Sequence, residues 1–413
     1  MNVLRSSKRV AYMDTSSEVL YPLSNASRDD LARICESLWG WTPCTSWVCR
    51  KACQQLIGCS CERVAKLETF FDFYRDITAY YIPDFTGDSC PALRSHDDLV
   101  DIVILLKSNA DKPRSGLTKE YFSQRFQNGH KKMPTIADQN RAFSLAARVF
   151  SMIQCSVENQ SDGLLEAGTQ PLTWHSDKSF ADFIDSVFRK RKQPALNPND
   201  DVALSARVHL ALVTAKRLRK VAHLKIIPTD NLGDHLLLDN TNGTVAIYHY
   251  TSVLKEHILA TGEDGIGETS TKSISNGNIP RQLALETLHT LKNILFPVDA
   301  ESQSLLRSLV SKANFDPDIL RLESSFYGGL DEHQIGYEYW GSRLIDLYDE
   351  LENPMPRSYL EKWIERRSGA RYMMMATLAG VAMAVLLGIL SLAVSIFQAW
   401  VGWQQWQHPV VKN

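Results

Sequence analysis

The stretch Met373–Phe397, MMMATLAGVAMAVLLGILSLAVSIF, decides how this 413-residue chain is built. No Asp, Glu, Lys or Arg occurs between Tyr372 and Val411, and the quoted run of 25 residues has three hydroxyl side chains as its polar groups. At about 1.5 Å of rise per residue, such a helix exceeds the roughly 30 Å hydrocarbon core of a bilayer. A soluble helix of this length would carry a polar stripe. We therefore expect one transmembrane helix over residues 372–399.

The basic residues around this helix predict its orientation. Five of them precede it closely: Arg357, Lys362, Arg366, Arg367 and Arg371. After it come Lys412 and the mostly neutral His408. Because Lys and Arg in short flanks stay in the cytosol, we expect Arg366, Arg367 and Arg371 to determine a cytosolic N-terminal domain. Residues 400–413 then form a short tail on the far side, as in tail-anchored proteins of the endoplasmic reticulum or secretory membranes rather than mitochondria.

Two features would suit the opposite orientation. N-glycosylation sequons begin at Asn25, Asn159 and Asn242, and five cysteines gather between Cys44 and Cys61. Residues 1–30 contain no apolar stretch typical of a signal peptide, so we interpret the sequons as chance occurrences. The cysteine spacings lack the paired C-x(2–4)-C pattern of structural zinc sites, which favours reduced thiols, although metal binding stays an alternative.

Aromatic residues are placed at both expected membrane interfaces. Trp400, Trp403 and Trp406 follow the apolar run at a spacing of three, and Trp363 lies in a basic, aromatic segment before it. Indole rings partition to the headgroup level, so we interpret all four as interface anchors, with a ligand-binding patch as the alternative. Residues 353–371 then form a juxtamembrane segment that includes a short helix lying against the bilayer.

Small residues recur every four positions inside the apolar run. Ala376, Gly380, Ala384 and Gly388 share one helix face, and such a face lets two helix backbones approach closely. This pattern predicts a homodimer or a helical membrane partner; the alternative is that Gly and Ala are simply common in membrane helices. The run holds no ionisable residue, which argues against a pore or proton relay formed by this helix alone.

The composition of the remaining chain is that of a folded protein without a strong charge bias. Hydrophobic residues make up 44% and charged residues 22%, with a net charge of −2. These values predict no nucleic-acid partner and a soluble part large enough for real hydrophobic cores. The sequence contains none of the short motifs of nucleotide-binding, zinc-protease or serine-hydrolase sites, so we predict no catalytic residue, metal ligand or cofactor.

Helical periodicity dominates the soluble part. We predict a disordered N-terminus over 1–30, a mainly α-helical domain over 31–352 that can comprise two subdomains, and a mobile Gly/Ser/Thr-rich loop at 262–279. A basic stretch at 107–135 reads as loop, and Ser95 with Asp98 forms a predicted capping box. The expected helices cover 31–41, 44–81, 95–106, 137–155, 180–188, 200–223, 252–261, 280–295, 300–313 and 332–352. One β-hairpin is expected, with strands at 235–238 and 245–248 around a turn that ends at Gly243.

Histidines concentrate around this hairpin. They are His209, His223, His235, His249 and His257. Five histidines in about fifty residues can mark a site, whereas ordinary core and surface histidines are the simpler explanation. If the domain contains a pocket, this region is the first place to look for it.

The C-terminal segment resembles a family of single-pass membrane proteins of filamentous fungi. The resemblance is carried by Arg343-Leu344-Ile345-Asp346-Leu347, Glu350-Leu351-Glu352-Asn353-Pro354, Glu365-Arg366-Arg367-Ser368-Gly369-Ala370-Arg371-Tyr372 and Phe397-Gln398-Ala399-Trp400. His235-Leu236, His249-Tyr250 and Leu254-Lys255-Glu256 are similar as well. The resemblance implies a fungal source and a membrane-tethered cytosolic domain, and it assigns no activity.

The favoured function is that of a membrane-tethered interaction or scaffold protein with cytosolic protein partners. One alternative is a membrane-bound enzyme with its site near His235 to His257. The other is an accessory subunit of a transporter, in which the Ala376/Gly380/Ala384/Gly388 face would bind a multi-span partner.

Overall fold

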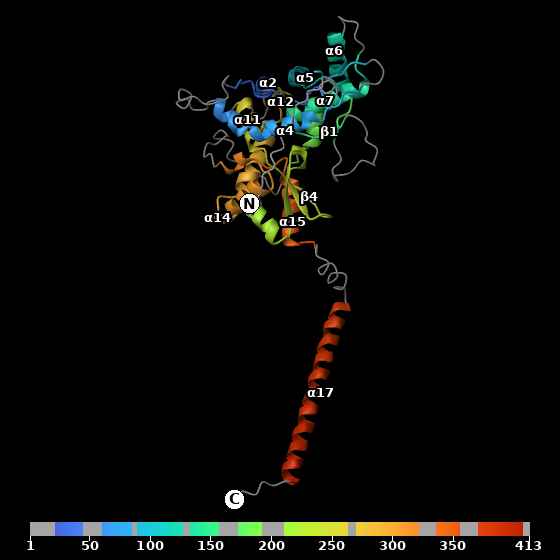
Figure 1. Cartoon of the computed structure of the whole chain (residues 1–413), viewed down its shortest axis with the longest axis vertical. Helices are drawn as coiled ribbons and strands as arrows, with labels where there is room; N and C mark the ends of the chain where they lie inside the picture. Colours follow the sequence, from blue (N-terminus) through green and yellow to red (C-terminus); the bar gives the residue numbers. More distant parts are fainter. Residues whose placement is uncertain are drawn as a thin grey trace, which may run out of the picture. The chain divides into compact units, whose positions relative to one another are not determined.

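The computed structural model describes residues 21–43, 60–84, 89–126, 133–156, 172–191, 210–262, 270–321, 336–355 and 371–407. These residues belong to two compact units, Met1–Pro354 and Met355–Asn413 (Figure 1). The first unit is mostly helical with short strands, and the second contains the long helix α17 (Arg371–Gln407). The predicted fold class, mainly α-helical with a small β-hairpin and one apolar C-terminal helix, is confirmed.

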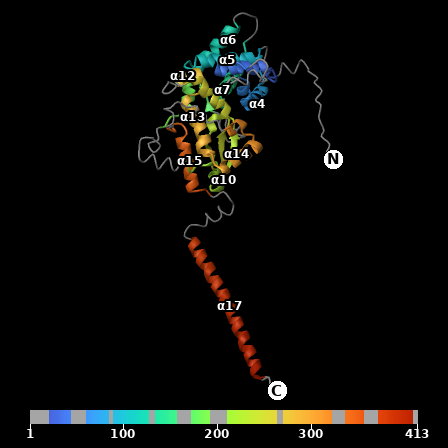
Figure 2. The ribbon, with the colours of Figure 1, turned by 90° about the vertical axis from the view of Figure 1, so that its left-hand side faces the viewer.

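Helices form both ends of the large unit. In Figure 2, α5, α6, α7 and α12 lie at one end and α10, α14 and α15 at the other. The helices are α2 (Arg28–Trp39), α3 (Ser60–Lys66), α4 (Glu68–Ala79), α5 (His96–Ser108), α6 (Arg114–Phe126), α7 (Ile136–Ser151), α8 (Phe180–Val187), α10 (Ala215–Lys220), α11 (Thr251–Thr261), α12 (Ser270–Gly277), α13 (Arg281–His289), α14 (Ala300–Lys312) and α15 (Gly341–Glu352). Shorter helical turns are η2 (Leu232–Asp234), η4 (Thr290–Leu295) and η5 (Pro317–Leu320).

Local sequence explains where several of these helices begin. Ser27 starts α2, since its hydroxyl accepts the N–H of Asp30 at 3.2 Å while the Asp30 carboxylate accepts the N–H of Ser27 at 2.8 Å. Ser179 starts α8 in the same way with Asp182. Helix α2 ends at Gly40, which has a φ of 73°, a conformation that glycine adopts without strain.

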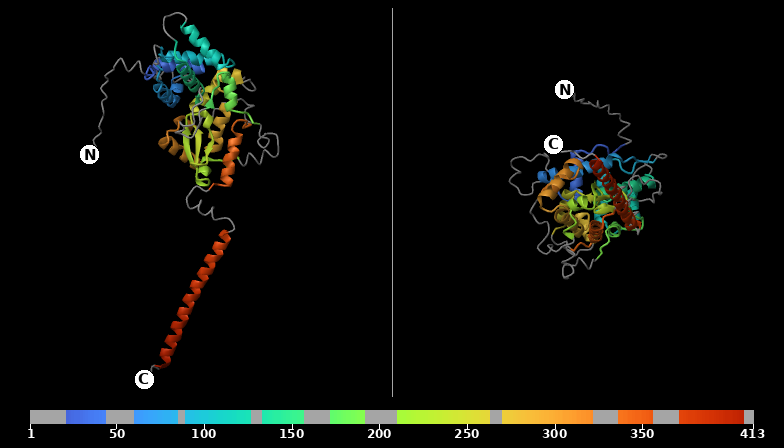
Figure 3. Two further views of the ribbon diagram at one scale, coloured as in Figure 1. Left: turned by 90° about the vertical axis from the view of Figure 1, so that its right-hand side faces the viewer. Right: turned by 90° about the horizontal axis from the view of Figure 1, so that it is seen from below.

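Three strands form a small mixed sheet, visible in yellow-green in Figure 3. Strand β5 (Thr244–Tyr248) lies in the centre, parallel to β3 (Lys225–Thr229) and antiparallel to β4 (Leu237–Asp239). The predicted hairpin is therefore confirmed as β4–β5, and its turn uses Gly243 at a φ of 64°. Strand β3 was not predicted, because it is short and contains Pro228, which an edge strand tolerates. A second pair, β1 (Cys155–Ser156) and β2 (Leu172–Thr173), is parallel.

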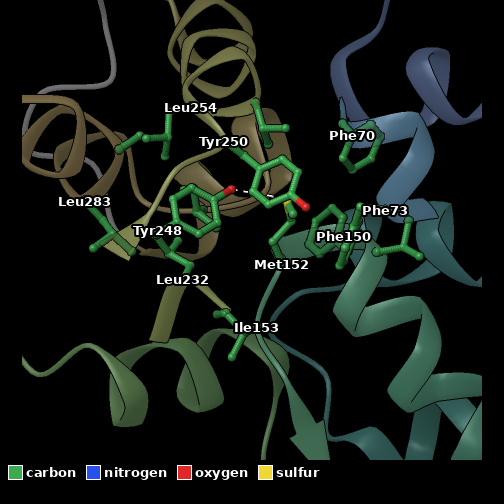
Figure 4. Close-up of a cluster of buried hydrophobic side chains, with 14 of the residues drawn as sticks. Phe70, Phe73, Phe150, Met152, Ile153, Leu232, Tyr248, Tyr250, Leu254 and Leu283 are labelled. Carbon is green, nitrogen blue, oxygen red and sulfur yellow. Dashed lines mark hydrogen bonds between the residues drawn. The ribbon is translucent and has the colours of Figure 1, made fainter. Parts of the chain in front are cut away.

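The core of the large unit joins the sheet to the helices around it. Tyr248 and Tyr250 from the end of β5 face Met152 and Phe150 from the end of α7 (Figure 4). The hydroxyl of Tyr248 lies 3.1 Å from the sulfur of Met152, and both residues are fully buried. On the far side of Tyr250 stands Phe73 of α4, with 5.8 Å between the ring centroids. A continuous set of buried apolar side chains therefore connects α4, α7 and β5.

Two stretches that the sequence assigned to loops are helical. Within 107–135, residues Arg114–Phe126 form α6, because Leu117 and Phe122 are buried against the core. Of its basic residues, Arg114 is buried and Lys119 is exposed. Within 262–279, residues Ser270–Gly277 form α12, whose Ile274 is fully buried. Small residues there serve close packing, since a Cβ at Gly277 would lie 2.1 Å from a methyl carbon of Thr261 in α11. Residues 263–269 lie outside the described part of the chain.

The Ser95–Asp98 capping box was wrong in its details. Helix α5 begins after Ser95 as expected, but the Ser95 side chain makes no capping hydrogen bond. The buried carboxylate of Asp98 instead accepts the backbone N–H of Arg94 at 2.8 Å and forms an ion pair with Arg125 of α6. Asp98 therefore stabilises the packing of α6 on α5 rather than the first turn of its own helix.

Other helices are shorter than predicted. The 44–81 pattern contains α3 and α4, which are separated at Leu67, and its part before Ser60 is not described. From the 200–223 pattern the described part contains α10 alone, and α15 begins at Gly341 rather than near 332. The predicted juxtamembrane helix with Trp363, Arg366 and Arg367, and four of the five clustered cysteines (Cys44, Cys49, Cys53 and Cys59), lie outside the described residues. The fifth, Cys61, is buried in α3.

Candidate functional site

Helix α17 contains the predicted apolar run. Within Thr377–Gln404 an 18-residue window reaches a mean hydropathy of 2.5, and none of the residues 377–404 is buried within the chain. Their 28 residues span about 42 Å at 1.5 Å per residue, which exceeds the hydrocarbon core of a bilayer. The Ser395 hydroxyl donates to the carbonyl of Ser391 at 2.9 Å, so this polar group is satisfied inside the helix. The chain therefore has one described helix that is long and apolar enough to cross a membrane.

The predicted packing face and anchors lie on this helix. Gly380, Ala384 and Gly388 stand one turn apart, and a Cβ added at either glycine would meet no heavy atom within 4 Å. Ala376 and Arg371 belong to the same helix, but their side chains are not described. The helix continues past residue 399 to Gln407 and includes three exposed indoles, Trp400, Trp403 and Trp406. A spacing of three residues places these indoles on one side of the helix.

In the described part of the large unit, two open clefts share Arg148 as a lining residue. The first, which we call the acidic cleft, measures about 850 Å³. Its lining comprises Thr69, Asp72, Phe73, Asp76 and Ile77 of α4 with the following Tyr80, then Arg148, Pro228, Thr229, Asp230, His249 and Tyr250, and finally Val310, Asn314, Phe315 and Pro317. The second measures about 640 Å³ and includes Tyr81, Ile82, Arg141 and Gln154. Tyr80 lines both clefts and is 83% exposed. Arg148 forms an ion pair with Asp230 at 2.7 Å between the two.

A buried polar network supports the floor of the acidic cleft. The N–H of Asp316 donates to Nδ1 of His249 at 2.9 Å, and the hydroxyl of Ser252 donates to the Asp316 carboxylate at 2.9 Å. Burial raises the pKa of Asp316 to about 6. Beside it, the ammonium of Lys255 lies 2.8 Å from the carboxylate of Asp318, and both side chains are almost fully buried. This network holds η5 against α11 and thereby places Phe315 in the cleft wall.

The histidines around the hairpin do not converge on one site. His235 accepts the N–H of Tyr248 on Nδ1 and donates from Nε2 to Thr290 at 2.8 Å. His257 accepts the indole N–H of Trp39 on Nδ1 at 3.1 Å. Burial lowers the pKa of His257 to about 3, and it lowers that of His235 well below the usual value. These two imidazoles are therefore neutral structural groups in separate contacts.

The remaining histidines of this group differ in their surroundings. Of the described members, His249 is a lining residue of the acidic cleft. His223 is exposed, and His209 lies outside the described residues. Across the described part of the chain, no three His, Cys, Asp or Glu side chains are arranged to hold a metal ion. The described histidines His235, His249 and His257 therefore have separate hydrogen-bond partners.

A third polar contact joins α15 to the core. Glu286 of α13 is fully buried, and its carboxylate accepts the N–H groups of Glu338, Tyr339 and Trp340 at 2.8, 2.9 and 3.3 Å. These N–H groups precede α15, where a helix has no internal acceptors for them. Burial raises the pKa of Glu286 to about 7, although the hydrogen bonds act in the opposite direction. We call this contact the Glu286 clasp.

Sequence reasoning missed the acidic cleft because its carboxylates are far apart in the chain. Asp72 and Asp76 come from α4, whereas Asp230 follows β3. The spacing of Asp72, Asp76 and Tyr80 is a usable signal, since it places them on one helix face. Comparison of the whole chain with known protein families, curated proteins and solved structures finds no match.

Proposed function

We propose that this chain is a membrane-anchored interaction protein, with α17 as the anchor and the large unit as the domain that meets partners. The observation that carries this proposal is the apolar segment Thr377–Gln404, in which no residue is buried within the chain. In water, the exposed Leu, Val, Ile and Met side chains of this 28-residue segment would be strongly unfavourable, at roughly 25 cal/mol for each Å² of apolar surface. A bilayer or a second apolar helix removes this cost.

The proposed orientation places the large unit in the cytosol. It rests on the basic residues that end with Arg371, the first residue of α17, and on the neutral segment that follows the apolar run. Protease protection on intact microsomes, with tags at both termini, tests it. Digestion of the N-terminal tag and absence of glycan at Asn25, Asn159 and Asn242 are expected. A protected and glycosylated large unit would reverse the orientation.

The interaction role is supported by the two open clefts rather than by a catalytic constellation. The enzyme alternative near His235 to His257 draws no support from His235 and His257, which are hydrogen-bonded structural groups in separate places. The transporter-subunit alternative depends on the face with Gly380 and Gly388, which is open in the single chain. Co-purification of a multi-span protein that is lost in Gly380→Leu would favour that alternative.

Full-length variants test the anchor directly. Leu387→Lys combined with Leu392→Asp places two charges near the centre of the span on different sides of the helix, where each costs about 2.5–3.5 kcal/mol of insertion free energy. We expect this variant to leave membranes on alkaline carbonate extraction, while the wild type stays. The matched control is Thr377→Lys with Gln404→Asp, which adds the same charges at the ends of the apolar segment. Retention of the central variant in carbonate-washed membranes would contradict the proposal.

A further inference from the structure

The second open cleft is lined by cations and neutral polar groups, and none of its lining residues is Asp or Glu. Two of them are arginines, Arg141 and Arg148. Together with Ser144 they repeat at a spacing of three and four residues, so they share one face of α7. We call this cleft, which measures about 640 Å³, the arginine cleft.

One cation next to the arginine cleft has no counter-charge. Arg148 is paired with Asp230 at 2.7 Å, and Arg141 lies 4.0 Å from the buried carboxylate of Asp138. Arg114 of α6 is 5% exposed, and in the described ranges it forms no ion pair with a carboxylate. Its Nε has no hydrogen-bond partner there either. Because a buried arginine is normally paired, this side of the cleft holds one positive charge in excess.

Arg114 lies directly behind the wall of the arginine cleft. Its Nη1 donates to Oδ1 of Asn140 at 2.7 Å, and Asn140 is a lining residue. Burial raises the pKa of the lining thiol Cys155 to about 12, while the charges of Arg148 and Arg114 act in the opposite direction. Since the Asn140 oxygen accepts from Arg114, the amide has its N–H groups left to donate. The wall therefore combines donors with a positive potential, which suits an anion.

Apolar side chains are exposed beside this wall. Tyr80 is 83% exposed and Ile82 is 45% exposed, and both line the arginine cleft. Ile136, which is 76% exposed, begins α7 and precedes the lining residue Ala137. The carbonyl of Ile82 accepts from Nη1 of Arg141 at 3.1 Å, so the apolar rim adjoins the basic wall. Neighbouring exposed apolar side chains are typical of surfaces that bind other proteins.

We propose that the arginine cleft binds an acidic peptide segment of a partner protein, with a Glu or Asp carboxylate on Arg141 and a neighbouring apolar side chain against Tyr80 and Ile82. A guanidinium and a carboxylate form two parallel hydrogen bonds, and the carboxylate offsets the excess charge of Arg114. Phosphate alone would leave the apolar rim without a contact. The volume is in the usual range for a ligand pocket. This inference rests on the proposed interaction role and names the chemistry of the partner.

The test uses the full chain in nanodiscs of phosphatidylcholine, a lipid without net charge. The probe is acetyl-Gly-Glu-Leu-Glu-Gly amide, and isothermal titration calorimetry measures its binding. Two counterparts each lack one feature: glutamine replaces both glutamates in the first, and serine replaces leucine in the second. Both should bind at least threefold more weakly than the probe. Arg141→Gln with Tyr80→Ser should weaken binding of the probe about tenfold, through one partly exposed ion pair and part of one apolar contact.

The control variant is Arg219→Gln with Val298→Ala, which removes an exposed cation and an exposed apolar group outside the cleft. It should bind the probe as the wild type does. Equal weakening in both variants, or no binding of the probe, would overturn the inference. Sodium pyrophosphate that displaces the probe at a lower concentration than unlabelled peptide would assign the cleft to phosphate ligands instead. Carbonate extraction separates these outcomes from a failure of the anchor, since the Arg141/Tyr80 variant should stay in the membrane.

Discussion

Replacing Glu286 by glutamine should change how the stability of the large unit depends on pH. The Glu286 clasp buries one carboxylate completely and uses it as the acceptor for three N–H groups at the start of α15. Burial disfavours the charged form more than these bonds favour it, so the pKa rises from 4.5 to about 7. Ionising this group at neutral pH therefore costs folding free energy, and a neutral isostere avoids that cost.

The magnitude follows from the two pKa values. Because the folded state holds the Glu286 proton more tightly, the contribution to stability is fully present below pH 4.5 and is lost as the pH rises to about 7. At 1.36 kcal/mol for each pH unit, the loss amounts to about 3 kcal/mol. Glutamine does not titrate in this range. The stability of Glu286→Gln relative to the wild type should therefore rise by about 3 kcal/mol between pH 4.5 and pH 8.

Urea unfolding of the full chain in a neutral detergent, followed by tryptophan fluorescence at pH 4.5, 6 and 8, measures this difference. Glu286→Ala is the informative comparison, because it removes the acceptor and leaves buried N–H groups without partners. We expect it to destabilise the large unit by about 2–5 kcal/mol at every pH. If the difference in unfolding free energy between the wild type and Glu286→Gln did not change with pH, the reasoning would be refuted. Equal stability of the alanine and glutamine variants would refute the role of the clasp as an acceptor.

Further substitutions test the packing of α11 and its neighbours. Gly277→Ala should lower the stability of the large unit by about 1–3 kcal/mol, because the new Cβ overlaps Thr261 of α11, and thermal unfolding measures this. Gly116→Ala in α6 is its control, because the nearest atom to the new Cβ lies 3.8 Å away. This variant should raise the free energy of unfolding by about 0.5–1 kcal/mol. If it lost as much stability as Gly277→Ala, the close approach of α11 and α12 would be contradicted. Lys255→Met should cost about 3–5 kcal/mol by leaving the buried Asp318 carboxylate unpaired, and adding Asp318→Asn should recover part of that loss. Urea unfolding of both Lys255 variants checks this, and an unchanged midpoint in Lys255→Met would contradict the buried ion pair.

Features that depend on near neighbours in the chain could be predicted from the sequence. The apolar segment in α17 can be recognised without tertiary information, because its hydropathy over that length is higher than that of helices in soluble proteins. Ser27 and Asp30 are three residues apart and satisfy each other, so the start of α2 is a local matter. The β4–β5 hairpin is similarly local, because its turn residues adopt the required conformation.

Features that depend on distant partners could not be predicted in this way. The sequence of α12 is typical of a loop because it is rich in small residues. These residues allow close contact with α11, and that contact cannot be recognised from the sequence of α12 itself. Asp98 reads as a capping residue until α6 brings Arg125 to it. The acidic cleft joins Asp76 to Asp230 across more than 150 positions of sequence, and the histidines, although close in sequence, point to different partners.

The Glu286 clasp also has a mechanical consequence. Helix α15 is the last described element of the large unit before the chain continues to α17. Any tension applied through a membrane-held C-terminus therefore enters the large unit at the Glu352 end of α15. The twelve residues of α15, including the buried Leu344 and Leu347, lie between that end and the Glu286 clasp. The Glu286 clasp is thus the hydrogen-bonded contact through which a force along α15 would pass to α13.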